Sequence, residues 1–199
     1  MTLRPRRGKF VALRWAVLWA VLVAVPTAGC EGSRREVDAP ADGTGFRGGD
    51  GTAALVAAAD RRPAPTLRGT TLDGESLDVG ALRGSVVVLN VWGSWCAPCK
   101  KEQPDLQRAA EDLAADGVRF VGINVRDRTT GNALAHYRRY GVTYPSIFDP
   151  SARLVARFRD LPPTAIPATI VIDRDGRVAA RVLGATSYDE ILALVRRIA

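Results

Sequence analysis

The sequence is poor in residues that bind transition metals. Its 199 residues include one histidine, His136, and three cysteines, of which only Cys96 and Cys99 lie close together. A structural zinc site takes about four such ligands, so it would have to recruit both His136 and the distant Cys30. We therefore expect no metal and no other cofactor. Half of a zinc site or a purely structural disulfide remains the alternative interpretation of the cysteine pair.

The chain also lacks a basic stripe. Its net charge is +7, but five of the 28 basic residues lie within residues 1–29, a segment without any acidic residue. Outside that segment, 23 basic residues face 21 acidic ones. A chain so close to neutrality is not expected to bind nucleic acid.

No apolar run in the first thirty residues is long enough to span a bilayer comfortably. The run at residues 15–25 has eleven apolar residues and follows a basic stretch. A membrane-spanning helix needs about 20 apolar residues, whereas the core of a signal peptide has about 7–15. Residues 1–29 therefore predict a signal peptide.

Small residues stand before the first cysteine. Ala28 and Gly29 precede Cys30, which resembles a bacterial lipoprotein cleavage site and implies a diacylglyceryl group on Cys30. Lipidation would also remove the odd cysteine of an exported chain. Pro26 and Thr27 depart from the usual pattern, so an uncleaved anchor, or secretion with a free thiol at Cys30, stays open as an alternative.

Composition divides the rest of the chain into two parts. Residues 30–62 are rich in Gly, Ala, Asp and Arg and can bury little surface, so we expect a flexible tether. Residues 63–199 contain the periodic apolar patterns of a folded domain.

That domain has a readable order of elements. Two short strands are expected within residues 66–77, a helical turn at 79–82, strands at 86–92 and 118–125 with a helix between them, a helix at 130–140, a hairpin of 168–172 with 178–183, and a last helix after the capping box Ser187-Tyr188-Asp189-Glu190. The long crossover between the strands at 86–92 and 118–125 makes them parallel. This order predicts an α/β thioredoxin fold with an N-terminal β-hairpin extension and an inserted α element, in which helices flank a central mixed sheet.

The two close cysteines stand where a buried strand gives way to a helix. Two cysteines separated by two residues at such a junction form a redox-active arrangement. Unpaired N–H groups and the helix dipole favour a thiolate at Cys96. Cys99, nearly one turn further on, can then attack a mixed disulfide and release the product.

Six motifs together resemble one family. They are Leu72-Asp73-Gly74, Leu82-Arg83-Gly84, Asn90-Val91-Trp92, Trp95-Cys96-Ala97-Pro98-Cys99-Lys100-Lys101-Glu102, Ile166-Pro167-Ala168-Thr169 and Ile172-Asp173-Arg174-Asp175-Gly176. From about residue 63 to 199 the chain resembles the TlpA/ResA-type thiol-disulfide oxidoreductases, the membrane-attached extracytoplasmic branch of the thioredoxin superfamily.

The resemblance implies roles for the cysteines and for Glu102. Cys96 matches the exposed nucleophile and Cys99 the resolving thiol, which together form the redox disulfide. Glu102 matches an active-site glutamate that carries a proton during exchange, although a glutamate exposed in the first helical turn is the simpler alternative. Asn90 stands where thioredoxin has a buried acid, which moves proton handling towards Glu102, although a structural amide that caps the strand end is equally compatible.

The resemblance also implies a substrate-binding surface. Pro167 matches a proline that follows a cis peptide bond beside the cysteines, where backbone groups can pair with an extended substrate segment. Ile166 would line that groove and Trp95 would lie over the disulfide, with Ala97 and Pro98 between the cysteines completing the contact surface.

Two aromatic side chains are expected to have no part in the chemistry. Trp92 is expected in the core and His136 on a solvated helix face. Gly93 stands where a peroxidase of the related peroxiredoxin group would need Thr or Ser, so peroxidase activity is disfavoured.

The function implied is that of a lipid-anchored enzyme on the extracytoplasmic face of the cell membrane. It would reduce disulfides in exported proteins, with apocytochrome c as the family-typical substrate, take electrons from a membrane thiol transporter of the CcdA/DsbD type, and act as a monomer. A disulfide-forming oxidant is the alternative enzyme, because thioredoxin-like sites span about −270 to −120 mV. A redox-inert adaptor and a metal-delivery module are the alternatives outside enzymes.

Overall fold

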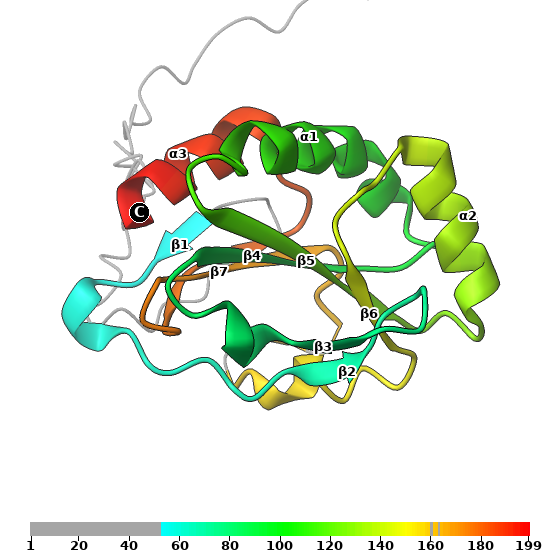
Figure 1. Ribbon diagram of the computed structural model, residues 1–199, viewed down its shortest axis with the longest axis horizontal. Coiled ribbons are helices and arrows are strands. Elements are labelled where there is room, and N and C mark those ends of the chain that lie inside the picture. Colours follow the sequence, from blue (N-terminus) through cyan, green and yellow to red (C-terminus); the bar gives the residue numbers. More distant parts are fainter. Residues whose placement is uncertain (1–52, 160, 163) are drawn as a thin grey trace, which may run out of the picture. The chain divides into compact units, whose positions relative to one another are not determined.

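The computed structural model describes residues 53–159, 161–162 and 164–199 (Figure 1). The predicted signal peptide, Cys30 and most of the predicted tether lie outside these residues. Within them, no helix has the length and the apolar character needed to cross a membrane.

A six-stranded mixed sheet forms the centre of the fold. Its strands, in spatial order, are β1 (Ala53–Leu55), β8 (Val178–Leu183), β7 (Ala168–Ile172), β4 (Val86–Trp92), β5 (Val118–Val125) and β6 (Ser146–Asp149). Strands β4, β5 and β6 are parallel, while β7 is antiparallel to both β4 and β8. A separate hairpin pairs β2 (Arg68–Thr70) with β3 (Ser76–Asp78).

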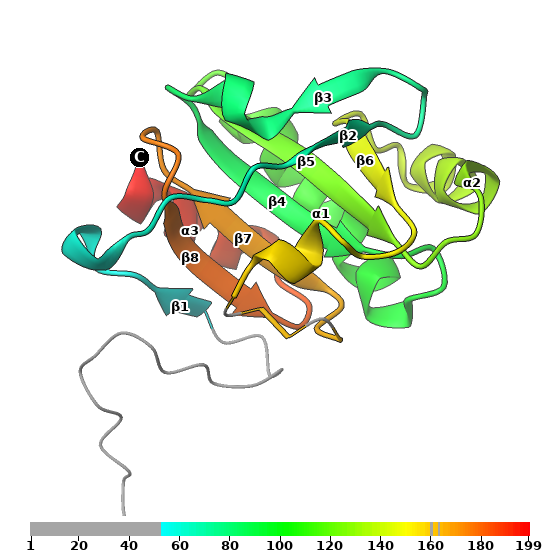
Figure 2. The same cartoon turned by 90° about the horizontal axis from the view of Figure 1, so that it is seen from below.

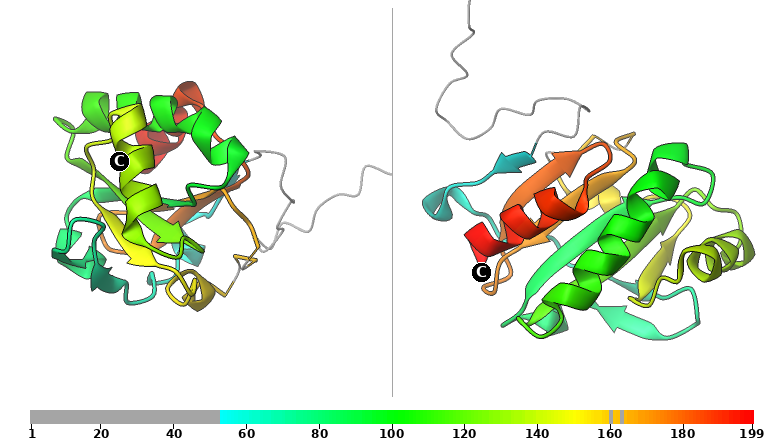
Figure 3. Two further views of the ribbon diagram at one scale, coloured as in Figure 1. Left: turned by 90° about the vertical axis from the view of Figure 1, so that its right-hand side faces the viewer. Right: turned by 90° about the horizontal axis from the view of Figure 1, so that it is seen from above.

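Helices cover the sheet unequally. Helices α1 (Ala97–Leu113) and α3 (Tyr188–Ile198) lie side by side on one face, and α2 (Thr130–Tyr140) lies beside the β6 edge (Figures 1 and 3). The opposite face carries the β2–β3 hairpin and the short 3₁₀ helix η3 (Val155–Arg157) (Figure 2). Two further 3₁₀ helices are η1 (Ala58–Asp60) and η2 (Val79–Leu82). The thioredoxin-like α/β fold predicted from the sequence is confirmed.

The fully buried strand β4 separates the two halves of the core. Val86 and Val88 belong to the cluster under α1 and α3, while Val87, Leu89 and Val91 belong to the cluster on the opposite face. Side chains alternate along a strand, so a continuous apolar sequence was needed to fill both halves. Because β4 is held on both faces, its carboxyl end is a firm base for the loop that follows.

Local sequence signals determine where the helices α2 and α3 begin or end. The side chains of Ser187 and Glu190 form the predicted capping box at the start of α3. Helix α2 ends at Gly141, whose φ of +63° is a left-handed conformation that glycine adopts without strain. Both features agree with the sequence analysis.

Two strands of the sheet were not predicted. Strand β1 pairs with the edge of β8, so the fold begins ten residues before the boundary expected at Pro63, and residues 53–60 of the predicted tether are partly strand and 3₁₀ helix. Strand β6 has four residues and follows Pro145. Neither segment has a periodic pattern that would predict a strand. Each is extended because it pairs with a neighbouring strand, and the local sequence does not indicate that pairing.

Candidate active site

The two cysteines lie where the carboxyl end of β4 meets the first turn of α1. Strand β4 ends at Trp92 and α1 begins at Ala97, so the connecting loop holds Cys96 directly at the helix start. Parallel strands β4 and β5 end at the same edge of the sheet, which is where α/β folds place their ligand sites.

Cys96 and Cys99 form a disulfide, and Cys96 is also the N-cap of α1. Its Sγ accepts a hydrogen bond from the Cys99 N–H over 3.2 Å. The resemblance implied an exposed nucleophile, but in the oxidised protein only 4% of Cys96 is exposed, and Cys99 is fully buried. In the reduced protein the same N–H group and the helix dipole would stabilise a thiolate at Cys96.

Glu102 is buried in the second turn of α1, three residues after Cys99 and thus on the same side of the helix. Only 2% of it is exposed, so the alternative of an exposed first-turn glutamate is wrong. Burial raises the pKa of Glu102 from 4.5 to about 7, and hydrogen bonds from the Thr186 N–H and the Asn90 side chain oppose that rise only in part. Near neutral pH this carboxyl group can therefore both take up and give back a proton.

Asn90 reaches Glu102 from the sheet. It lies in the middle of β4, is 1% exposed, and donates from Nδ2 to Oε1 of Glu102 over 2.8 Å. The Thr186 N–H donates to the other carboxylate oxygen, Oε2, over 3.0 Å. The Glu102 carboxyl group is thus held by two hydrogen bonds, one from β4 and one from the segment before α3.

The segment before β7 closes the other side of the site. The peptide bond between Ile166 and Pro167 is cis, as predicted. Ile166 packs against the cluster that contains Cys96 and Cys99. The carbonyl of Pro167 accepts a hydrogen bond from Gly184 over 2.9 Å.

Trp95 is the one large apolar side chain of the described residues that stands exposed, at 49%. Its Nε1 donates to the carbonyl of Val125 over 3.3 Å, which ties the loop to the end of β5. A side chain on Gly93 would collide with this indole, because a Cβ there would lie 2.6 Å from Nε1 of Trp95. The loop therefore has no room for the Thr or Ser of a peroxidase.

Trp92 lies in the core, as expected. It is fully buried, donates from Nε1 to the Ser146 hydroxyl over 3.0 Å, and stacks on Tyr137 with 5.0 Å between ring centroids.

The solvated position expected for His136 is wrong. The residue is 5% exposed, and its ring lies 4.6 Å from that of Trp92. Its Nε2 is 3.2 Å from Oε1 of Gln103, the neighbour of Glu102 on α1. Burial and the Lys100 ammonium lower the pKa of His136 to about 4, and the Asp127 carboxylate offsets only part of this. Ala133, buried one turn earlier on α2, was the sequence signal for this buried face.

Asp127 was missed by the sequence analysis. It is 4% exposed and accepts hydrogen bonds from the backbone N–H and the hydroxyl of Ser94, at 2.9 and 2.6 Å. The Asn124 side chain donates to it over 2.7 Å. Asp127 thereby holds the loop that leads into Cys96, a contact between distant segments that no local pattern indicates.

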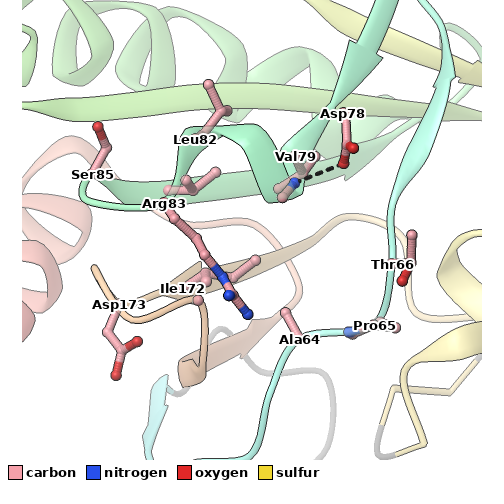
Figure 4. A pocket seen from close by; sticks show the side chains of 13 residues that line it. Ala64, Pro65, Thr66, Asp78, Val79, Leu82, Arg83, Ser85, Ile172 and Asp173 are labelled. Atoms are coloured by element: carbon pink, nitrogen blue, oxygen red, sulfur yellow. Dashed lines mark hydrogen bonds between the residues drawn. The ribbon is translucent and has the colours of Figure 1, made fainter.

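A cavity of about 320 Å³ lies at the opposite end of the sheet, near the start of β4 and the end of β7 (Figure 4). The side chain of Arg83 extends into it, while Asp78 and Asp173 at its rim are already engaged by hydrogen bonds and ion pairs. It contains neither cysteine, and we assign it no part in the chemistry.

Comparison with known proteins agrees with this geometry. The Redoxin family matches residues 57–192, which is more than half of the chain. The chain belongs to the redoxin family. The thiol-disulfide oxidoreductase ResA of Bacillus thuringiensis (strain Al Hakam) is 26% identical over 137 residues, 69% of this redoxin and 77% of ResA.

Solved structures give the same answer. This redoxin is 35% identical to a DsbF homologue from Corynebacterium diphtheriae, with a TM-score of 0.70 over 76% of this chain and 97% of that one. A secreted thiol-disulfide isomerase from Corynebacterium glutamicum matches at 35% identity and a TM-score of 0.71, over 77% and 95% of the two chains. This redoxin is therefore a thiol-disulfide oxidoreductase of the TlpA/ResA type.

Proposed function

We propose that this redoxin reduces disulfides in exported proteins from the extracytoplasmic face of the cell membrane, held there by a lipid on Cys30. Apocytochrome c, whose thiols must be reduced before haem attachment, is the substrate we propose. The observation that carries the proposal is the buried, proton-accepting Glu102 beneath a helix capped by Cys96. The similarity to ResA and to a secreted isomerase supports it.

The reaction begins with the reduced protein. The Cys96 thiolate attacks one sulfur of the substrate disulfide, and the other substrate sulfur leaves as a thiolate. Cys99 then attacks Sγ of Cys96, which releases the second substrate thiolate and forms the Cys96–Cys99 disulfide. Two electrons pass to the substrate, and two protons end on its thiols.

Glu102 accepts and later returns the proton of Cys99. A fully buried thiol is disfavoured as a thiolate, because burial penalises charge. A carboxylate with a pKa of about 7 can accept that proton as Cys99 attacks and return it to the departing substrate thiolate. Asn90 and the Thr186 N–H keep the carboxylate oriented for this transfer.

The substrate segment docks between Trp95 and Ile166. The exposed indole and the isoleucine give an apolar contact beside Cys96. Because the Pro167 carbonyl is already paired with Gly184, an extended substrate pairs with the backbone of Ile166 instead. Ala97 and Pro98, at the helix start, form the floor of this contact.

The oxidised protein must be reduced again. In an oxidising compartment the electrons have to come from a partner, and we propose a membrane thiol transporter of the CcdA/DsbD type. One redoxin chain supplies both cysteines and Glu102, so a monomer is sufficient.

A trapping experiment tests the substrate. In cells that produce Cys99→Ala protein, mixed disulfides accumulate on Cys96, because the resolving thiol is missing. Recovery of cytochrome c precursors supports the proposal. Recovery of oxidase assembly factors, or of a broad set of secreted proteins, contradicts the proposed substrate.

Kinetics test the enzyme and its direction. The reduced protein should reduce a small disulfide-bonded protein, and Cys96→Ser should not; equal rates would leave only an adaptor. Equilibration with thiol buffers gives the reduction potential. A value near −120 mV, as in strong oxidants, would favour disulfide formation instead.

The anchor has its own test. Full-length chains with Cys30 intact and with Cys30→Ser are produced with a labelled fatty acid and fractionated. Label and membrane association should disappear in Cys30→Ser. A labelled or membrane-bound Cys30→Ser protein would contradict lipidation at Cys30.

A further inference from the structure

A hollow of about 680 Å³ opens between the first turn of α1 and the exposed side of α2. Ser94, Lys100, Asn132, His136, Arg139 and Tyr140 line it. It is distinct from the apolar contact formed by Trp95 and Ile166, and the reduction mechanism above does not use it.

The hollow begins within one helical turn of Cys96. Ser94 is two residues before Cys96, and the Lys100 N–H is hydrogen-bonded to the Cys96 carbonyl, so Lys100 stands one turn above Cys96 on the same face of α1. A polypeptide joined to Cys96 can therefore reach the Lys100 side chain.

The charge of the lining is positive. Lys100 and Arg139 are both exposed, and among the described residues neither forms an ion pair with a carboxylate. The Arg139 guanidinium lies 5.9 Å from the centre of the Tyr140 ring, a contact that leaves its N–H groups available to a ligand.

One buried carboxylate, Asp127, offsets part of this positive charge. Asp127 lies behind Ser94 and accepts three hydrogen bonds, two from Ser94 and one from Asn124. These neutral donors leave its single negative charge in place, which offsets at most one of the two cations. No acidic residue is among those that line the hollow. His136 is kept neutral at pH 7 by its burial, so the fixed charge comes from Lys100 and Arg139.

We propose that this hollow receives an acidic side chain of the polypeptide that is disulfide-bonded to Cys96. This inference rests on the proposed function, since it names a feature of the substrate of that site. One helical turn rises about 5.4 Å and an extended residue spans about 3.3 Å. The preferred Asp or Glu therefore stands about two residues from the partner's reacting cysteine.

The consequence is a docking surface with two unlike flanks. Trp95 and Ile166 offer apolar contact next to Cys96, and Lys100 and Arg139 attract negative charge in the separate hollow. A partner with both an apolar and an acidic residue near its cysteine can satisfy the two contacts at once.

Synthetic peptides test the proposal. Each carries an intrachain disulfide and differs at one position, two residues from a cysteine, which is Asp, Asn or Lys. The rate of reduction by the reduced wild-type protein is compared with that by dithiothreitol, which has no such hollow and reports each peptide's intrinsic reactivity. After this correction, we expect kcat/KM for the Asp peptide to exceed that for the Asn peptide about two- to fivefold, with the Lys peptide slowest.

Charge removal from the protein gives the matched comparison. In a protein with both Lys100→Gln and Arg139→Gln, the preference for Asp over Asn should fall to near one. Arg196→Gln removes one exposed positive charge from the far end of α3 and should keep the full preference. Raising the salt concentration should weaken the wild-type preference.

Two outcomes distinguish a failure of this proposal from a failure of the proposed function. Reduction of all three peptides at equal corrected rates would overturn the acidic preference and leave the enzyme function intact. Failure to reduce any peptide would contradict the proposed function. In that case the affinities of labelled peptides with Ser in place of Cys, measured by fluorescence anisotropy, decide on the hollow: tighter binding of the Asp peptide supports it, and equal binding overturns it.

Discussion

Asn90 donates a hydrogen bond to Glu102 across 2.8 Å, and both side chains are buried. Within the part of the chain that the structure describes, Oδ1 of the same amide has no hydrogen-bond partner. An amide turned by 180° exchanges its donor for its acceptor. Asn90 can therefore donate to the ionised carboxylate or accept from the protonated acid, so it can accompany Glu102 through a proton transfer.

Replacing Asn90 by Ala should raise the pKa of Glu102 further. A hydrogen bond to the charged carboxylate contributes about 1.5–3 kcal/mol and one from the neutral acid about 0.5–1.5 kcal/mol. The difference of about 1–1.5 kcal/mol corresponds to about one pH unit. Titration of the Glu102 carboxyl carbon by NMR measures the change. Asn124→Ala, which removes a buried amide from Asp127 instead, is the control and should leave the Glu102 titration in place. An unchanged titration in Asn90→Ala would show that the hydrogen bond is unimportant.

Glu102→Gln should change how stability depends on pH. The folded protein holds the proton of Glu102 up to about pH 7, whereas the unfolded chain loses it near 4.5. Glu102 therefore stabilises the fold below pH 4.5, and this contribution is lost as the pH rises through 7. The unfolding free energy of Glu102→Gln minus that of wild type should increase by about 3 kcal/mol from pH 4 to pH 8. Denaturant titrations of the oxidised proteins at several pH values measure it, and a flat difference would contradict the buried acid.

His136→Gln should show the opposite slope. The folded protein keeps His136 neutral down to about pH 4, whereas the unfolded chain takes up the proton near 6.5. His136 therefore stabilises the fold above pH 6.5, and this is lost as the pH falls to 4. The unfolding free energy of His136→Gln minus that of wild type should decrease by about 3 kcal/mol from pH 4 to pH 7. Denaturant titrations at those pH values check this prediction, and a difference that rises with pH would refute it.

Gly93→Ala should destabilise the loop before Cys96. A Cβ at this position would lie 2.6 Å from Nε1 of Trp95 and 3.0 Å from the carbonyl of Val125. Overpacking of this kind costs about 1–3 kcal/mol, which thermal unfolding detects as a lower Tm. Gly131→Ala in α2 is the control, because its Cβ would meet only Thr129 at 3.7 Å. It should raise the Tm slightly, since alanine favours helix; a Gly93→Ala protein as stable as wild type would exclude the predicted clash.

The parts of the fold that were predictable are those with strong local signals. Helix α2 has the predicted bounds, because Thr130 follows a polar loop and Gly141 ends the helix. The β7–β8 hairpin follows from two apolar runs around a turn that contains Gly176. At the site, the position of Cys96 followed from the change from strand to helix.

The unpredicted parts depend on contacts between distant segments. His136 is buried because α2 packs on Trp92, and its partner Gln103 is 33 residues away in the chain. Asp127 meets Ser94 at a separation of 33 residues as well. Such pairings depend on how helices and loops pack on the sheet. The periodicity of a single segment carries no information about that packing.

The pairing of β1 with β8 also limits association between copies of this protein, because it covers the edge of β8. Exposed strand edges invite uncontrolled association between copies of a protein. Along the described residues, β1 covers one margin of the sheet, and a β-bridge from Thr71 to Ile147 shields the β6 margin. The outer edge that β1 itself presents has only three residues, which is too short to template a long strand from another chain.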